Sequence, residues 1–254
     1  MTTAPRQVLA DRGIGQRDGF RWRGGEISRV EGFSDAVFAF AVTLLVVSLE
    51  VPRTFHELAA AMRGFVVFAV CFTLLIVVWR EHYVFFRRYG LQDNGTIWLN
   101  AALLFVALFY VYPLKFLFNV VFAGVTGAPR EVPGPEGRLE PVIETGQVPS
   151  LFLIYGAGVI ALYLLLALMY AHAYRLRGAL DLTPLEVFDT RASIRSHLLA
   201  AAIGVLSCLV AVTVPARMVG LAGFVYFLFG PVMAIDGMWT GRRRRRLFEG
   251  NSGA

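Results

Sequence analysis

Six hydrophobic stretches alternate with polar segments along the 254-residue chain. They are residues 33–51, 63–84, 97–122, 150–174, 196–214 and 216–240. Each is close to the length of about 20 apolar residues that an α-helix needs to cross a bilayer. The pattern therefore predicts an all-α membrane protein with six transmembrane helices, the last two joined by a tight turn.

The polar segments divide the chain into three regions. Residues 1–28 contain no apolar run typical of a signal peptide, and we expect a polar cytoplasmic arm there. Residues 29–241 form the expected six-helix domain. Its longest connection, 124–149, is rich in Gly, Pro and Glu and must lie outside the membrane, because irregular backbone cannot face lipid. Residues 242–254 are expected to form a basic cytoplasmic tail, and a short helix is expected at 184–190, before the fifth span.

The arginines are distributed unevenly between the two sides of this predicted topology. Eighteen of the 23 lie in the N-terminal region, in the connections after the second and fourth spans, or in the C-terminal tail. Cytoplasmic loops carry an excess of Lys and Arg, so this side is predicted to be cytoplasmic. Both termini then lie in the cytoplasm, as an even number of spans requires.

The run Arg242–Arg246 directly follows the last predicted span. In that position it indicates contact with anionic lipid headgroups rather than with nucleic acid. Cys71 and Cys208 both fall inside predicted spans, so the sequence predicts neither a disulfide framework nor a cysteine metal motif. No metal and no cofactor are expected.

The first span carries unusual polar residues at its cytoplasmic end. These are Arg29, Glu31, Ser34 and Asp35, and a lone Thr43 follows in the apolar part. Ionisable groups at membrane depth are costly and usually functional. A carboxylate there needs a partner, and the candidates for Asp35 are Arg29, Trp79, Arg80 and His82.

One face of the same helix forms a regular stripe. It consists of Ala36, Phe40, Thr43 and Val47, spaced i, i+4, i+7 and i+11. Periodicity alone favours packing against a neighbouring helix, since Thr is common at such contacts. A functional face is the alternative.

Several motifs in the first half of the chain occur together. Residues 33–45 read F-S-D-A-x-x-A-x-x-x-T-L-L, with Arg29 four residues ahead. W-R-E-H follows at Trp79–His82, I-W-L-N at Ile97–Asn100, and Y-P at 112–113. Over residues 29–118 this combination resembles the transmembrane-protein-175 family of potassium channels, in its prokaryotic form with one six-helix repeat.

The resemblance implies a potassium-favouring cation channel, a homotetramer in a prokaryotic plasma membrane, with no enzymatic activity. The first helix of each subunit would line the pore, without the backbone-carbonyl filter T-V-G-Y-G. Thr43 would form a hydroxyl ring and Phe40 the constriction, where the family usually has Ile or Leu; Ala36 and Val47 share this face. The residues that would support the helix end are Arg29, Phe33, Ser34, Asp35, Trp79, His82 and Asn100.

Three alternatives remain open. Phe40 could close the pore, which would give a family member that does not conduct. A proton-coupled transporter would use Asp35 and His82 as its titrating pair, but the predicted midplane is almost free of charge. A membrane enzyme would need convergent catalytic groups, and the sequence has no H-E-x-x-H motif.

Overall fold

The computed structural model describes residues 19–47, 53–126, 131–133, 138–215 and 218–248. The long helices are α2 (Arg29–Val47), α4 (Phe65–Tyr89), α5 (Asn94–Thr126), α6 (Val148–Arg175), α7 (Pro184–Thr213) and α9 (Phe229–Phe248). The short helices are α3 (Phe55–Arg63), η1 (Thr145–Gln147), α8 (Leu221–Phe224) and η3 (Val225–Leu228). Strands β1 (Glu131–Pro133) and β2 (Leu139–Pro141) form an antiparallel hairpin.

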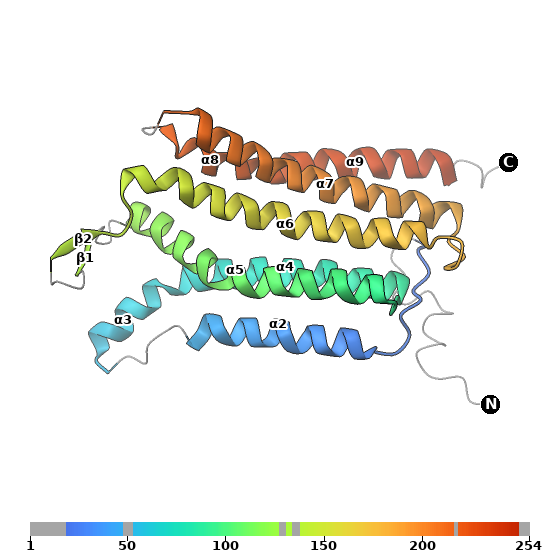
Figure 1. Cartoon of the computed structure of the whole chain (residues 1–254), viewed down its shortest axis with the longest axis horizontal. Coiled ribbons are helices and arrows are strands. Elements are labelled where there is room, and N and C mark those ends of the chain that lie inside the picture. The colour runs from blue at the N-terminus through green and yellow to red at the C-terminus, as the bar shows by residue number, and fades with distance from the viewer. Residues whose placement is uncertain (1–18, 48–52, 127–130, 134–137, 216–217, 249–254) are drawn as a thin grey trace.

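The long helices run side by side in one bundle (Figure 1). α6 packs along both α5 and α7, α9 packs on α7, and α2 contacts α4 and α5. α2 and α9 therefore lie at opposite edges of the bundle (Figure 1). The hairpin and α3 lie at one end. The other end, which we call the arginine-rich end, holds the start of α2 and the C-termini of α4, α6 and α9.

Five helical segments among the described residues are long and apolar enough to cross a membrane: α4, α5, α6, α7 and the α8–α9 segment. α2, which carries Arg29, Glu31 and Asp35 in its first two turns, is not one of the five. The predicted all-α membrane fold is confirmed in outline. The hairpin β1–β2, inside the expected 124–149 connection, is the one element type that the prediction missed in the described part.

The fifth predicted span, 196–214, is too short. α7 begins at Pro184 and absorbs the short helix expected at 184–190. A capping box fixes this start, since the Glu186 N–H donates to Thr183 Oγ1 and the Thr183 N–H donates to a Glu186 oxygen. Pro184 occupies the first turn, where a missing N–H costs nothing. The helix therefore starts at its cap rather than where the apolar run begins.

The sixth predicted span, 216–240, is wrong at both ends. The chain forms α8 and η3 first, and α9 then continues to Phe248. Arg242–Arg246, the first residues of the expected basic tail, are accordingly helical, which agrees with the good helix propensity of arginine. Residues 249–254 of the expected tail lie outside the described residues.

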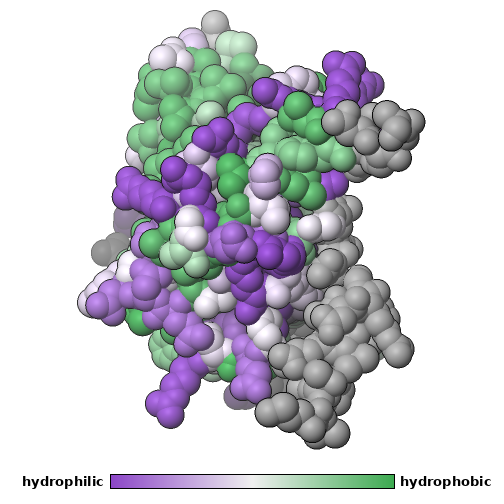
Figure 2. All heavy atoms as spheres, turned by 90° about the vertical axis from the view of Figure 1, so that its right-hand side faces the viewer, coloured by the Kyte–Doolittle hydropathy of each residue, from purple (hydrophilic) through white to green (hydrophobic). Residues whose placement is uncertain are grey.

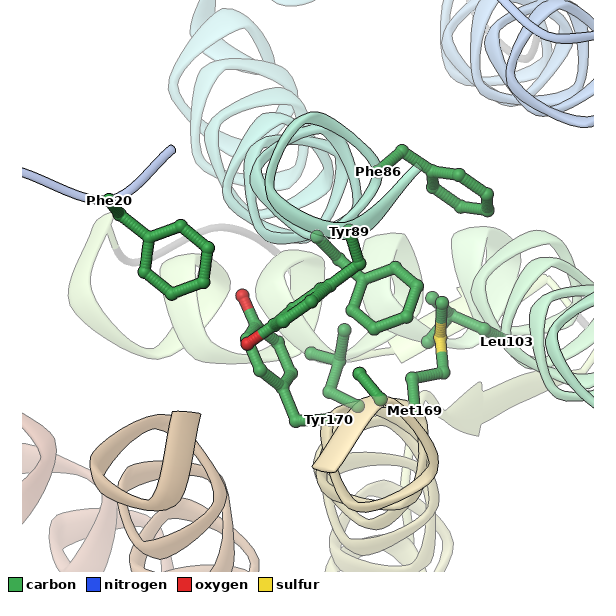
Figure 3. Close-up of a cluster of buried hydrophobic side chains, with 9 residues drawn as sticks. Phe20, Phe86, Tyr89, Leu103, Met169 and Tyr170 are labelled. Atoms are coloured by element: carbon green, nitrogen blue, oxygen red, sulfur yellow. The ribbon is translucent and has the colours of Figure 1, made fainter. Parts of the chain in front are cut away.

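Residues 19–28 lie against the bundle at the arginine-rich end. Phe20 is buried in a cluster that includes Phe85, Tyr89, Met169 and Tyr170 (Figure 3). The N–H groups of Arg23 and Gly24 both donate to the carbonyl of Arg87. A Cβ on Gly24 would come within 2.6 Å of the Phe86 carbonyl oxygen, so this close approach requires glycine. The remainder of the expected arm, residues 1–18, lies outside the described residues.

Candidate functional site

α2 has one face packed inside the chain and one face exposed. Its buried side chains include Ser34, Phe38, Ala41 and Leu45, which pack on α4 and α5. Their spacing of three to four residues defines a single face of the helix. The opposite face is therefore left without cover from the chain's own helices.

The predicted stripe lies on this exposed face. Phe40 is 55% exposed, and Ala36 and Thr43 are exposed as well. Val47 continues the stripe by position, at the last residue of α2, but its side chain is outside the described set. An apolar face at the edge of a helical bundle must be covered by lipid or by another chain.

Thr43 has a specific hydrogen-bonding state. Its Oγ1 donates to the carbonyl of Ala39 at 3.0 Å, within its own helix. A hydroxyl carries one proton and two acceptor lone pairs. Because the proton points back along the helix, the lone pairs of Thr43 are available to a group outside it. Thr43 Oγ1 can therefore accept a hydrogen bond or contact a cation outside the helix.

Ser34 and Asn100 join α2 to α5. Ser34 Oγ donates to the Val30 carbonyl at 2.7 Å and accepts a hydrogen bond from Asn100 Nδ2 at 2.9 Å. Both side chains are buried. A buried polar pair of this kind fixes the rotation of one helix against the other, since either partner alone would lose its hydrogen bond.

Asp35 is held by Trp79 from α4. Trp79 Nε1 donates to Asp35 Oδ1 at 2.8 Å, and the indole stacks on Tyr83 with ring centres 5.6 Å apart. The sequence proposed Trp79 as a partner of Asp35, and the structure places the two in direct contact.

His82 and Arg29 occupy different positions from those expected. His82 is 1% exposed and packs between the rings of Phe38 and Phe86, and neither ring nitrogen meets a hydrogen-bond partner among the described residues. Arg29 is exposed and forms no ion pair with any carboxylate in the described part. Phe33 is 65% exposed, next to Ala36 on the outward face. Four residues of the expected network form two separate hydrogen-bonded pairs, Asn100 with Ser34 and Trp79 with Asp35. His82 contributes by packing.

Sequence reasoning missed Arg87 as a partner of this helix end. Arg87 lies 3.5 Å from Glu31 and donates to the Gly24 carbonyl at 2.9 Å. Glu31 also caps α2, accepting from the Ser28 N–H at 2.8 Å. The spacing S-x-x-E is the capping-box signal that could have located Glu31 at the helix start. Arg87, 56 residues further along the chain, has no comparable local signal.

A small cavity lies beside this end of α2. It measures about 90 Å³ and is lined by Ile27, Glu31, Asp35, Trp79, His82, Tyr83 and Arg87. At about 30 Å³ for each water molecule, it has room for about three. His82 lines this cavity although its ring is almost completely buried. No group of three or more His, Cys, Asp and Glu residues that could bind a metal occurs among the described residues.

Comparison with known proteins decides the family. The profile of the family described as "Endosomal/lysosomal potassium channel TMEM175" matches residues 29–110, the part that holds α2, α4 and the first half of α5. A protein of Marivirga tractuosa named "Potassium channel" is 42% identical over 252 residues, which cover 93% of this chain and 96% of that protein. This chain belongs to the TMEM175 family.

Other TMEM175-like proteins match over different lengths. A crystal structure of the potassium channel MtTMEM175, a threonine-to-alanine variant in complex with a nanobody–MBP fusion protein, has a TM-score of 0.76 and 41% identity, and covers 90% of this chain and 100% of that one. A potassium channel of Streptomyces collinus is 32% identical over 98 residues, 36% of this chain and 48% of that protein. The resemblance predicted over residues 29–118 is confirmed, and in the Marivirga tractuosa protein it extends over nearly the whole chain.

Proposed function

We propose that this TMEM175-family protein is a potassium-favouring channel whose pore is lined by α2 from each of four subunits. The observation that carries the proposal is the outward face of α2, where Phe40 and Thr43 are exposed although the helix is packed on its other side. One chain with one such helix cannot enclose a water-filled path. Four copies facing a common axis would cover these residues and leave a path between them.

In this arrangement Phe40 forms the constriction and Thr43 a hydroxyl ring one turn further along. The outward lone pairs of Thr43, left free by its bond to Ala39, would replace part of the hydration of a cation. A few neutral acceptors make a weak site, which suits an ion that must also leave. Ala36 and Val47 extend the path on either side. Potassium is the transported ion, and the protein needs no resident cofactor and performs no enzymatic reaction.

We also assign α2 to the membrane, which raises the number of spans from five to six. The polar groups at its start lie at the arginine-rich end, where Arg87, Trp79 and Asn100 hold them, so that the apolar part from Ala36 onwards lies in the membrane. With six spans and the positive-inside rule, the arginine-rich end faces the cytoplasm of a prokaryotic cell. Anionic headgroups are the expected partners of the arginines there.

The proposal is tested by potassium flux from liposomes that contain the purified protein. Phe40→Ala should increase the flux by widening the constriction, and Thr43→Ala should lower the preference for potassium over sodium. Matched controls lie on other helices: Phe105→Ala on α5 removes a ring that is also exposed, and Thr73→Ala on α4 removes a hydroxyl bonded to its own helix in the same way. Neither control should alter the flux.

The outcomes also separate the alternatives. Flux that appears only in Phe40→Ala would identify a family member closed by its phenylalanine ring. Saturable flux tied to a proton gradient would identify a coupled transporter instead. Equal effects of the α2 variants and their controls would overturn the assignment of α2 to the pore.

A further inference from the structure

Two aromatic rings at the arginine-rich end are each held between two guanidinium groups. Tyr174, at the end of α6, has the guanidinium carbons of Arg177 and Arg191 at 4.7 and 4.9 Å from its ring centre. Trp239, on α9, has those of Arg195 and Arg243 at 4.5 and 5.2 Å. We call these six residues the arginine–aromatic ridge.

The two halves of the ridge are joined through α7. Arg191 and Arg195 are four residues apart on that helix and therefore project from the same face, one turn apart. α7 packs on both α6 and α9, so the ridge crosses three helices. Figure 2 shows that hydrophilic side chains gather at this end of the molecule.

Most of the positive charge on the ridge is not neutralised by the protein. Arg195 binds Asp236, with Nε 2.7 Å from Oδ1. Arg177, Arg191 and Arg243 are exposed, and none of them forms an ion pair with a carboxylate in the described part of the chain. The aromatic residues orient these guanidinium groups without cancelling their charge, and Arg191 Nε and Nη2 also donate hydrogen bonds to the Tyr174 hydroxyl oxygen.

Planar guanidinium groups bind phosphate oxygens in pairs, so oriented arginines without carboxylates favour a phosphate ligand. The position of the ridge favours a phosphate that is attached to a lipid. Leu198, three residues after Arg195, is 47% exposed, and Ile235, one turn before Trp239, is 63% exposed. Both are on helical segments long enough to cross a membrane. A ligand with a phosphate and an acyl chain would contact both the arginines and these apolar side chains.

We propose that the arginine–aromatic ridge is a binding site for the headgroup phosphate of an anionic phospholipid. The phosphate lies across Arg191 and Arg243, and its acyl chain runs past Leu198 and Ile235. Trp239 lies at the boundary between headgroup and chain, where membrane proteins concentrate tryptophan. The ridge lies on α6, α7 and α9 and not on α2, so this site is separate from the proposed pore; it rests on the headgroup contact proposed above for the arginine-rich end (Figure 1).

The test is native mass spectrometry of the purified, delipidated full-length protein with equimolar phosphatidylglycerol and phosphatidylcholine. Wild type should retain phosphatidylglycerol preferentially. Each of Arg191→Gln and Arg243→Gln should weaken its binding about five-fold, the effect of about 1 kcal/mol for one arginine near a headgroup. Arg138→Gln, which removes the same charge at the opposite end of the bundle, should leave binding unchanged.

Two further variants keep the test decisive if a glutamine variant unfolds. Arg191→Lys and Arg243→Lys keep the charge but lose the paired geometry, and should bind phosphatidylglycerol more weakly than wild type. Wild-type affinity in all four ridge variants, or the same loss in Arg138→Gln, would overturn the proposal. Displacement of the lipid by millimolar inorganic phosphate would show a site for soluble anions and would overturn it as well.

Discussion

At the scale of single residues, Ser34 and Asn100 show how the cost of a buried polar group depends on which partner is removed. Ser34 can satisfy its proton on Val30 without Asn100, whereas the hydrogen bond of Asn100 Nδ2 among the described residues goes to Ser34. Asn100 Oδ1 has no partner among the described residues. Removing the serine therefore leaves a buried amide unpaired, whereas removing the asparagine removes that amide and its unpaired oxygen together.

We predict that Ser34→Ala destabilises the protein by about 1–3 kcal/mol, the cost of a buried donor without a partner. Asn100→Leu should cost less, and the double variant should recover part of the loss caused by Ser34→Ala. Chemical unfolding of wild type and the three purified variants in detergent measures these differences in the free energy of unfolding. A larger loss for Asn100→Leu than for Ser34→Ala would contradict the account.

At the scale of elements, the start of α7 anchors the segment that leads into α2. Glu186 is completely buried and accepts hydrogen bonds from Arg21 and Arg23, the shortest at 2.7 Å from Arg23 Nη2. Residues 21–28 then run directly into the first turn of α2. The position of the α2 end is therefore set partly by a carboxylate more than 150 residues away in the sequence.

Glu186→Gln should release this segment, because it removes the carboxylate that binds Arg23 and leaves Arg21, among the described carboxylates, with only its longer, exposed ion pair to Asp181 at 3.6 Å. Breaking a buried ion pair costs roughly 3 kcal/mol or more. We expect faster hydrogen–deuterium exchange in residues 20–25, measured by mass spectrometry. Glu81→Gln is the control, since the Arg80–Glu81 pair is partly exposed and is worth less than about 1 kcal/mol. Similar exchange in both variants would contradict the role of Glu186.

A second link between elements joins the start of α5 to the end of α6. Asp93 Oδ2 lies 2.7 Å from His172 Nε2, and Thr96 Oγ1 donates to Asp93 Oδ1 at 2.6 Å. Burial opposes the charged form of Asp93, but the hydrogen bonds from Thr96 and His172 outweigh it and lower its pKa below the ordinary 3.8. The charged carboxylate is therefore part of the folded state.

The lowered pKa of Asp93 determines the direction in which stability changes with pH. A carboxylate with a lowered pKa in the folded state contributes stability above its ordinary pKa and loses it as the pH falls through the folded value. Wild type should thus be more stable than Asp93→Asn at pH about 6, and the difference should shrink between about pH 4 and pH 2. Thermal unfolding of both proteins over this range measures it. A difference that does not depend on pH would contradict the assignment.

At the scale of the whole molecule, the sequence was informative wherever neighbouring residues decide the structure. The hydrophobic runs located the long helices, and periodicity placed Phe40 and Thr43 on one face of α2. Periodicity alone favoured packing for that face, and only the family resemblance assigned it to a pore. Long-range partners could not be predicted: Glu186 looked like part of a polar connection, yet it is a buried partner of Arg21 and Arg23. Because charged side chains interrupt residues 184–195, the hydrophobic run did not show that α7 begins at Pro184.

The proposed assembly is compatible with the two edges of the bundle. α2 presents an outward face at one edge, whereas α9, with exposed apolar residues such as Ile235, lies at the other (Figure 1). Four chains arranged with α2 inside would give a central path and a lipid-facing rim. In this arrangement Thr43 would face that path.

The most direct test is the potassium current of Thr43→Cys in a planar bilayer, before and after a water-soluble, thiol-reactive methanethiosulfonate reagent. Cys71 and Cys208 are replaced by alanine in the background, and Thr73→Cys on α4 serves as the control. The account predicts that the reagent blocks most of the current through Thr43→Cys and leaves Thr73→Cys unchanged. An unmodified current in Thr43→Cys, or equal block in both variants, would contradict it.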